Sequence, residues 1–101
     1  METSNYQLIH NEAAERFELD INGLTPYVQY TRVNDSLLII EHTEVPPLLE
    51  GKGVGKMLVE KTLNYIEKQG WKIVPLCPFT TAYIKRHPEW ERIVYKGNTR
   101  V

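Results

Sequence analysis

The sequence has a single cysteine, no long apolar run and almost no net charge. Cys77 stands alone among 101 residues, which excludes an internal disulfide and any zinc site built from several cysteines. No apolar stretch is long enough to cross a bilayer, and residues 1–4 do not have the pattern of a secretory signal peptide. These absences predict a cytoplasmic protein with no membrane partner.

The balance of charge argues against a nucleic-acid-binding protein. The chain carries 12 Lys and Arg residues against 13 Asp and Glu residues, and its formal net charge is -1. Proteins held to nucleic acid by general attraction carry a clear excess of basic residues. The length suits one domain with one modest core, so we expect a single domain over residues 1–101 with its core over about 5–95.

What the sequence does contain is a run of three alternating glycines, Gly51, Gly53 and Gly55, between an apolar strand pattern and a helical one. Glycine allows a tight turn and lets backbone amides approach a ligand closely. A helix that begins there offers unpaired N–H groups and the positive end of its dipole. The segment predicts an anion site, most often for phosphate. A tight turn with no ligand is the alternative, and the loop alone does not decide between them.

Two well-known phosphate loops do not fit this run. A Walker loop needs Gly at Glu50 and Ser or Thr at Met57. The dinucleotide fingerprint needs a further Gly at Lys56, inside a βαβ unit. What remains is a Gly-x-Gly loop that opens a helix after a strand and a loop containing Pro46 and Pro47.

The first half of the chain predicts an antiparallel meander. Asn22-Gly23 lies between alternating segments and is a strong hairpin signal, because both residues accept positive φ. The run 36–45 begins apolar throughout, as expected of a central strand covered on both faces. In that strand, alternation places His42 on the same face as Ile40 and Glu44. The four expected strands are residues 6–10, 16–21, 24–33 and 36–45.

The second half predicts a long helix, a strand and a short helix. Apolar positions recur at helical spacing over 54–69, and Gly70 is a suitable C-terminal stop. Thr80 can cap a short helix that runs to about His87. The apolar helical stripe consists of Val54, Leu58, Thr62 and Ile66, widened by Val59 and Leu63. The remaining expected elements are a strand over 72–74, a last short strand over 92–95 and a loose tail from Gly97.

This order of elements and four short blocks resemble the GNAT superfamily of N-acetyltransferases, in its small YjdJ-type branch. The resemblance implies an α+β, GNAT-like fold in a minimal version that lacks the early helices, with no helical period before residue 45. Glu50 stands where the superfamily motif usually has Gln or Arg. The blocks are His42-Thr43-Glu44-Val45-Pro46-Pro47, Glu50-Gly51-Lys52-Gly53-Val54-Gly55, Pro75-Leu76-Cys77-Pro78-Phe79 and His87-Pro88-Glu89-Trp90.

The resemblance also implies acetyl-CoA as co-substrate, with no metal. The pantetheine arm would lie between the strand that ends near Val45 and the strand that ends near Val74. Lys52 and Lys56 would add charge at the pyrophosphate, although both could equally be solvated lysines at a helix start. The implied contacts are Thr43, Glu44 and Val45 for pantetheine, and Gly51, Lys52, Gly53, Val54, Gly55 and Lys56 for pyrophosphate.

Three side chains are candidates for catalysis, each with a plainer alternative. Cys77 follows the second strand and could take the acetyl group as a thiolate, only line the pocket, or be a buried apolar thiol. His42 could accept the proton of the amine or activate Cys77, or could be a structural histidine of the sheet. Tyr83 lies where relatives protonate the leaving thiolate, and a packing role is equally open.

The sequence therefore predicts an N-acetyltransferase that moves an acetyl group from acetyl-CoA to an amine. The amine could belong to a small molecule, a protein lysine or a protein N-terminus, and the sequence does not identify it. A CoA-binding or protein-interaction module with little turnover is the alternative. An anion-binding fold without CoA is a third reading.

Overall fold

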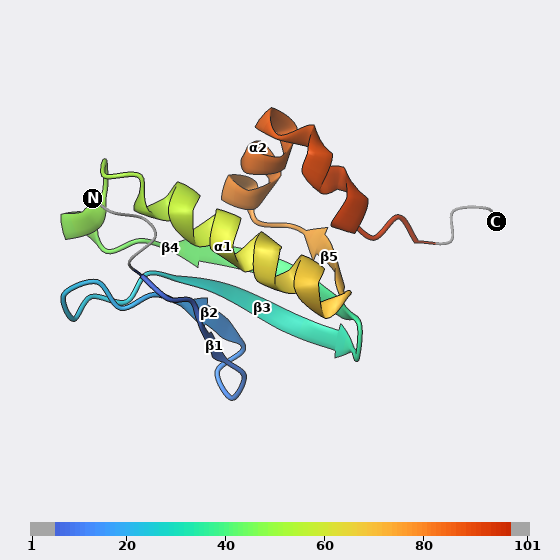
Figure 1. The fold of residues 1–101 in the computed structure, drawn as a ribbon, viewed down its shortest axis with the longest axis horizontal. Helices are drawn as coiled ribbons and strands as arrows, with labels where there is room; N and C mark the ends of the chain where they lie inside the picture. Colours follow the sequence, from blue (N-terminus) through green and yellow to red (C-terminus); the bar gives the residue numbers. More distant parts are fainter. Residues whose placement is uncertain (1–5, 98–101) are drawn as a thin grey trace.

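Five strands form one mixed sheet in the order β1-β2-β3-β4-β5, and the long helix α1 lies across one of its faces (Figure 1). The computed structural model describes residues 6–97. Strands β1 to β4 pair antiparallel, and β4 pairs parallel with β5 after the crossover through α1. The elements are β1 (Ile9–Asn11), β2 (Arg16–Glu18), β3 (Tyr27–Asn34), β4 (Leu37–Glu44), the 3-10 turn η2 (Pro47–Leu49), α1 (Val54–Gln69), β5 (Lys72–Pro75), α2 (Pro78–Arg86) and the 3-10 turn η3 (Pro88–Ile93).

The antiparallel meander predicted for the first half is confirmed, with shorter strands near its hairpin. Asn22 has φ 54° and Gly23 has φ 82°, the two positive values that the Asn-Gly pair predicts. The expected strand over 16–21 stops at Glu18, and the hairpin closes with one isolated pair, Ile21 and Leu24. The return strand begins late because Pro26 has no N–H to donate to a ladder.

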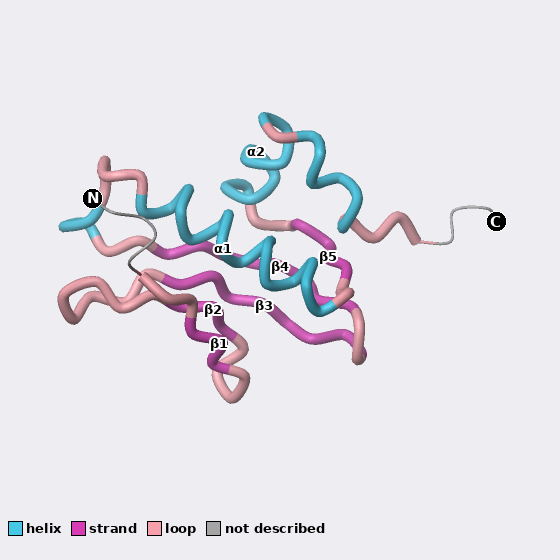
Figure 2. The backbone as a smooth tube through the Cα atoms, in the orientation of Figure 1, coloured by secondary structure: helices cyan, strands magenta, loops and turns pink. Residues whose placement is uncertain are grey.

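The helix α1 begins and ends where the sequence predicts. The predicted apolar stripe is buried against the sheet, and the side chains between helix and sheet form the core of the molecule. Gly70 has φ 78°, and its N–H bonds back to the carbonyls of Glu67 and Ile66, so it terminates the helix as expected. From residue 6 to the end of β4 the chain contains no helix, which matches the minimal fold (Figure 2).

A β-bulge in β4 overturns the predicted orientation of His42. Gln29 of β3 pairs with His42, whereas the next residue, Tyr30, pairs with Ile40, so Glu41 is an extra residue on β4. An extra residue reverses the alternation of faces beyond it. Ile40 is therefore buried while His42 is exposed, and the prediction that the two share a face is wrong.

The C-terminal third differs from the prediction in two places. The helix α2 begins at Pro78 after Cys77 as its N-cap residue, so Thr80 lies inside its first turn instead of capping it. Proline at the first helical position suits such a start. The expected strand over 92–95 is wrong: η3 extends through Ile93, and only Val94 forms a bridge, to Ile73. The tail beyond Gly97 and residues 1–5 lie outside the described residues.

Candidate functional site

A cavity lies where β4 and β5 separate. β5 pairs with β4 only as far as Ile40 and Pro75, and the amides of Leu76 and Cys77 both donate to the Ile40 carbonyl, at 2.9 and 3.0 Å. β4 continues to Glu44 beyond this point, paired only with β3. The outer edge of β4 from the bulge onward therefore has backbone groups with no strand partner.

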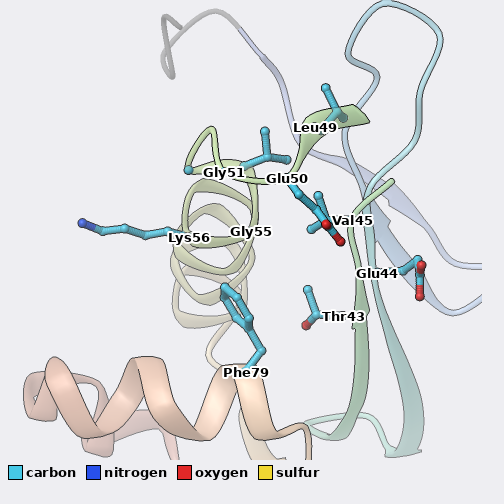
Figure 3. Close-up of a pocket in the computed structure, with 11 residues that line it drawn as sticks. Thr43, Glu44, Val45, Leu49, Glu50, Gly51, Gly55, Lys56 and Phe79 are labelled. Atoms are coloured by element: carbon cyan, nitrogen blue, oxygen red, sulfur yellow. The ribbon is translucent and has the colours of Figure 1, made fainter. Parts of the chain in front are cut away.

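The cavity has a volume of about 470 Å³ and is bounded by three elements (Figure 3). The end of β4 forms one wall, the loop into α1 with the first turn of that helix forms the second, and the start of α2 contributes Phe79. The two segments predicted to hold acetyl-CoA thus line one space, with the exception of Lys52. The lining residues are Thr43, Glu44, Val45, Leu49, Glu50, Gly51, Gly53, Val54, Gly55, Lys56 and Phe79.

The start of α1 presents free backbone amides to this cavity. The N-cap residue is Gly53, which has no side chain to cap the helix, and the first turn contains no acidic residue. Within residues 6–97, no backbone hydrogen bond of the loops and caps engages the amides of Val54, Gly55 or Lys56; the first amide bonded to the loop is that of Met57, to Gly53 O at 3.0 Å. Such a terminus attracts an anion through its N–H groups and its dipole.

Glycine is required at the three positions of the loop for two different physical reasons. Gly51 and Gly53 have φ 81° and 76°, values that a side chain would strain, and a Cβ at either would meet no atom within 4 Å. Gly55 has no positive φ. A Cβ on Gly55 would lie 2.7 Å from Cζ of Phe79, so this glycine makes room for the aromatic ring (Figure 3).

Phe79 is a cavity residue that the sequence reading did not single out. It follows Cys77 and Pro78 in the first turn of α2, and its side chain lies opposite Thr43 in the cavity (Figure 3). The residue is 44% exposed although it is aromatic. An exposed aromatic ring next to free amides suits a ligand that has both an apolar arm and an anionic group. The sequence did contain a signal for this residue, because Phe79 is the last residue of the block Pro75-Leu76-Cys77-Pro78-Phe79.

Cys77 lies behind the cavity wall and does not line it. The residue is 2% exposed, and Sγ lies 3.3 Å from Oγ1 of Thr43, which does face the cavity. Burial alone would raise the pKa of the Cys77 thiol. The hydrogen bond with Thr43 and the neighbouring groups of Thr80 and Phe79 outweigh burial, so the pKa of the thiol is lower than usual. The structure therefore does not support the prediction that Cys77 only lines the cavity.

His42 and Glu44 lie on the face of the sheet opposite to α1. Nε2 of His42 lies 2.8 Å from Oε1 of Glu44, and the His42 side chain is 57% exposed. Figure 3 shows the Glu44 carboxylate pointing away from the cavity, so Glu44 contributes its backbone to the lining. The β-bulge therefore separates His42 from the cavity, and the geometry gives no support to its predicted catalytic role.

Tyr83 lines a neighbouring cavity of about 330 Å³ together with Lys56, Phe79 and Arg86. Its ring packs on His87 with the centroids 4.4 Å apart. Burial raises the pKa of the Tyr83 hydroxyl, and the carboxylate of Glu60 raises it further. Tyr83 does not line the larger cavity, so the structure does not bring it together with Thr43 in one space.

Among residues 6–97, no three His, Cys, Asp or Glu side chains come together as ligands for a metal ion. No helix in the same range combines the length and the hydropathy needed to cross a membrane.

Comparisons with known proteins agree with this fold. Among curated proteins, Protein NATD1 of Gallus gallus is 26% identical over 84 residues, which is 81% of this chain and 76% of the relative. Protein NATD1 of Homo sapiens is 26% identical over 81 residues, covering 78% of this chain and 72% of the relative. The NMR structure of a GCN5-like protein from Staphylococcus aureus shares the fold with a TM-score of 0.65, at 22% identity, over 96% of this chain and 97% of the other.

The family is shown by a match that spans most of the chain. The model described as GCN5-related N-acetyl-transferase matches residues 16–93, from the start of β2 to the end of η3. This range includes both walls of the cavity and the whole of α2. On this evidence, the chain belongs to the GCN5-related N-acetyltransferase family.

Proposed function

We propose that the chain binds acetyl-CoA in the cavity between β4 and α1 and transfers the acetyl group to an amine. The observation that carries the proposal is the meeting, in one cavity, of free amides at the start of α1 and an unpaired edge of β4. Membership of the N-acetyltransferase family supports the same ligand and reaction class.

Each wall suits a different part of acetyl-CoA. The amides of residues 54–56 suit the pyrophosphate, because they and the helix dipole offer positive charge to an anion, whereas Figure 3 shows the Lys56 side chain pointing away from the cavity. The free backbone groups of residues 43–45 suit the amides of the pantetheine arm, which would add to the edge of β4 like a short strand. The Phe79 ring offers apolar contact to the same arm.

The acetyl thioester supplies an acyl group that an amine can attack directly. For that route the chain needs to hold the thioester beside the end of β4 and leave its far side open to the amine. We favour direct transfer over transfer through Cys77, because the thiol lies behind Thr43 and has 2% exposure. Replacement of Cys77 by Ala tests this: near-normal turnover supports direct transfer, whereas lost turnover and a trapped acetyl-protein in the wild type support the covalent route.

The binding proposal is tested by thermal unfolding with and without acetyl-CoA. A ligand that binds only the native state raises the melting temperature. The informative variant is Gly53→Asp, which adds a negative charge where the pyrophosphate is expected. Its matched control is Gly23→Asp, because Gly23 also has a positive φ, 82°, with nothing within 4 Å of its absent Cβ.

We expect both variants to fold, and only Gly53→Asp to lose the melting shift. Loss of the shift in both, or no shift in the wild type, would overturn the binding proposal and leave an anion-binding fold without CoA. Release of free CoA with a panel of amines then separates an enzyme from a CoA-binding module.

The single cysteine favours a reducing compartment such as the cytoplasm as the place of action.

A further inference from the structure

The bulge in β4 that turns His42 away from the cavity also brings Thr43 into it. Counted from Ile40, strict alternation would place residue 42 on the face that α1 covers and residue 43 on the opposite face. The extra residue Glu41 reverses this order. Thr43 pairs with Val28, which is 1% exposed, and directly paired residues point to the same face. The Thr43 side chain therefore lies on the cavity side of β4.

Thr43 supplies the only hydroxyl side chain among the described residues that line the cavity. The charged side chains of the lining point elsewhere. Figure 3 shows Glu44 and Lys56 directed away from the cavity. The same view shows Glu50 extending toward Val45. A ligand with carbonyl oxygens beside the end of β4 would thus meet one side-chain O–H donor, that of Thr43.

Cys77 holds the Thr43 hydroxyl from behind the cavity wall. The Cys77 backbone is fixed on both sides, because its amide donates to the carbonyl of Ile40 at 3.0 Å and its carbonyl accepts from the amide of Thr81 at 2.9 Å. Its side chain is buried, and Sγ lies 3.3 Å from Oγ1 of Thr43. Across residues 6–97, Sγ is the only side-chain partner in hydrogen-bonding geometry with Oγ1. The position of the sulfur therefore orients the hydroxyl.

Both protons of this pair find an acceptor only when the thiol donates to the hydroxyl. A hydroxyl has one proton and two lone pairs, whereas a thiol is a weak donor and a weak acceptor. If the hydroxyl donates to Sγ, the thiol proton has no acceptor in hydrogen-bonding geometry within the described part of the chain. If the thiol donates to Oγ1, the hydroxyl proton is free for an acceptor in the cavity. A ligand carbonyl favours the second arrangement.

We propose that the Thr43 hydroxyl donates a hydrogen bond to a carbonyl oxygen at the thiol end of the pantetheine arm, and that Cys77 is the positioning residue that orients this hydroxyl. The inference rests on the proposed function. With the pyrophosphate at the amides of residues 54–56 and the arm along the edge of β4, Thr43 is the lining residue of that strand furthest from the glycine loop. The arm has two acceptors there, the thioester carbonyl of acetyl-CoA and the nearest amide carbonyl. No bond forms to the sulfur of Cys77, in line with direct transfer.

The test is isothermal titration calorimetry with acetyl-CoA and with CoA. We expect Thr43→Val to raise the dissociation constant of acetyl-CoA by about three- to tenfold, because a neutral hydrogen bond is lost. Thr43→Ser keeps the hydroxyl and should bind as the wild type does. A loss for acetyl-CoA alone assigns the bond to the thioester carbonyl, and an equal loss for CoA assigns it to the amide carbonyl.

Thr31 on the neighbouring strand β3 is the matched control. Its hydroxyl also makes a side-chain hydrogen bond, to Oε2 of Glu41 at 2.8 Å, but it does not line the cavity. Thr31→Val should leave the dissociation constants of both ligands unchanged. If Thr43→Val melts far below the wild type without ligand, Thr43→Ala makes the same comparison.

A double-mutant cycle tests the role of Cys77. Cys77→Ala should raise the dissociation constant of acetyl-CoA by about two- to fivefold, because the hydroxyl loses the partner that orients it. The same substitution should add nothing in the Thr43→Val background, since residues that act through one contact are not additive. Cys77→Ser keeps a donor beside Oγ1 and should restore most of the affinity.

Three results would overturn the inference while acetyl-CoA binding by the wild type stands. They are wild-type affinity in Thr43→Val, an equal loss in Thr31→Val, and an equal loss from Cys77→Ala in both backgrounds, which would show that the cysteine acts independently of Thr43. If the wild type binds neither ligand, the proposed function and this inference are both overturned.

Discussion

At the scale of single residues, Glu50 is the side chain that fits a phosphate site least well. It lines the cavity directly before Gly51, and Figure 3 shows its side chain extending toward Val45. A carboxylate near two phosphates repels them, although water and salt screen the interaction at this exposed position. The free amides and the dipole of α1 oppose that repulsion.

Replacing the carboxylate by an amide should therefore strengthen acetyl-CoA binding. We expect Glu50→Gln to lower the dissociation constant by about two- to fivefold at low ionic strength, with a smaller gain in high salt. Isothermal titration calorimetry at two salt concentrations measures both effects. Glu44→Gln is the control, because that carboxylate points away from the cavity and pairs with His42. An equal gain in the control, or weaker binding by Glu50→Gln, would contradict this account of the site.

At the scale of elements, a buried histidine connects β1 to β3 and α1. The His10 side chain is 8% exposed, Nε2 lies 2.6 Å from the hydroxyl of Tyr30, and Nδ1 lies 3.2 Å from that of Tyr65. Its ring stacks on Phe17 with the centroids 4.5 Å apart. Burial lowers the pKa of His10, and the nearby Glu12 carboxylate offsets part of this.

The lowered pKa makes the stability of the fold depend on pH. Below the unfolded pKa of about 6.5 the unfolded chain binds a proton that the folded His10 resists, so the free energy of unfolding falls as the pH falls toward the folded pKa. Urea unfolding at about pH 7 and about pH 5 should show a smaller loss in His10→Gln than in the wild type. His42→Gln replaces an exposed histidine and should keep the wild-type loss. Equal losses in all three proteins would show that carboxylates govern this range.

Features of the elements that depend on local spacing could be predicted from the sequence, and features that depend on pairing between strands could not. The stripe of α1, the stop at Gly70 and the positive φ at Asn22 and Gly23 follow from local spacing, so they were predictable. The bulge at Glu41 depends on how β4 pairs with β3, which no local pattern in β4 reveals. Because of that one extra residue, His42 lies on the face opposite to the one that the alternation predicts. The start of α2 was a missed signal, because Pro78 suits the first helical position better than Thr80 suits the cap.

At the scale of the whole molecule, the cavity forms because the turn from β4 into α1 meets the start of α2. The edge of β4 and the amides of α1 belong to one continuous segment, residues 43–56, and the ring of Phe79 reaches the same space from the start of α2 (Figure 3). The glycine loop and the edge of β4 were predicted to share a ligand. The contribution of Phe79 was not, because it depends on the packing of α2 against Gly55.

A ligand that bridges these parts should leave a pattern in amide hydrogen exchange. Acetyl-CoA should slow exchange at residues 43–45 and 53–56, where the free amides would gain partners or shelter from water. The hairpin around Gly23 lies outside the lining and should exchange at the same rate with and without ligand. Protection confined to 53–56 would indicate an anion site that binds phosphate without the pantetheine arm. Protection at both segments together would indicate that one molecule spans both walls. A free phosphate would bind at the amides of α1 and would leave the edge of β4 exposed to exchange.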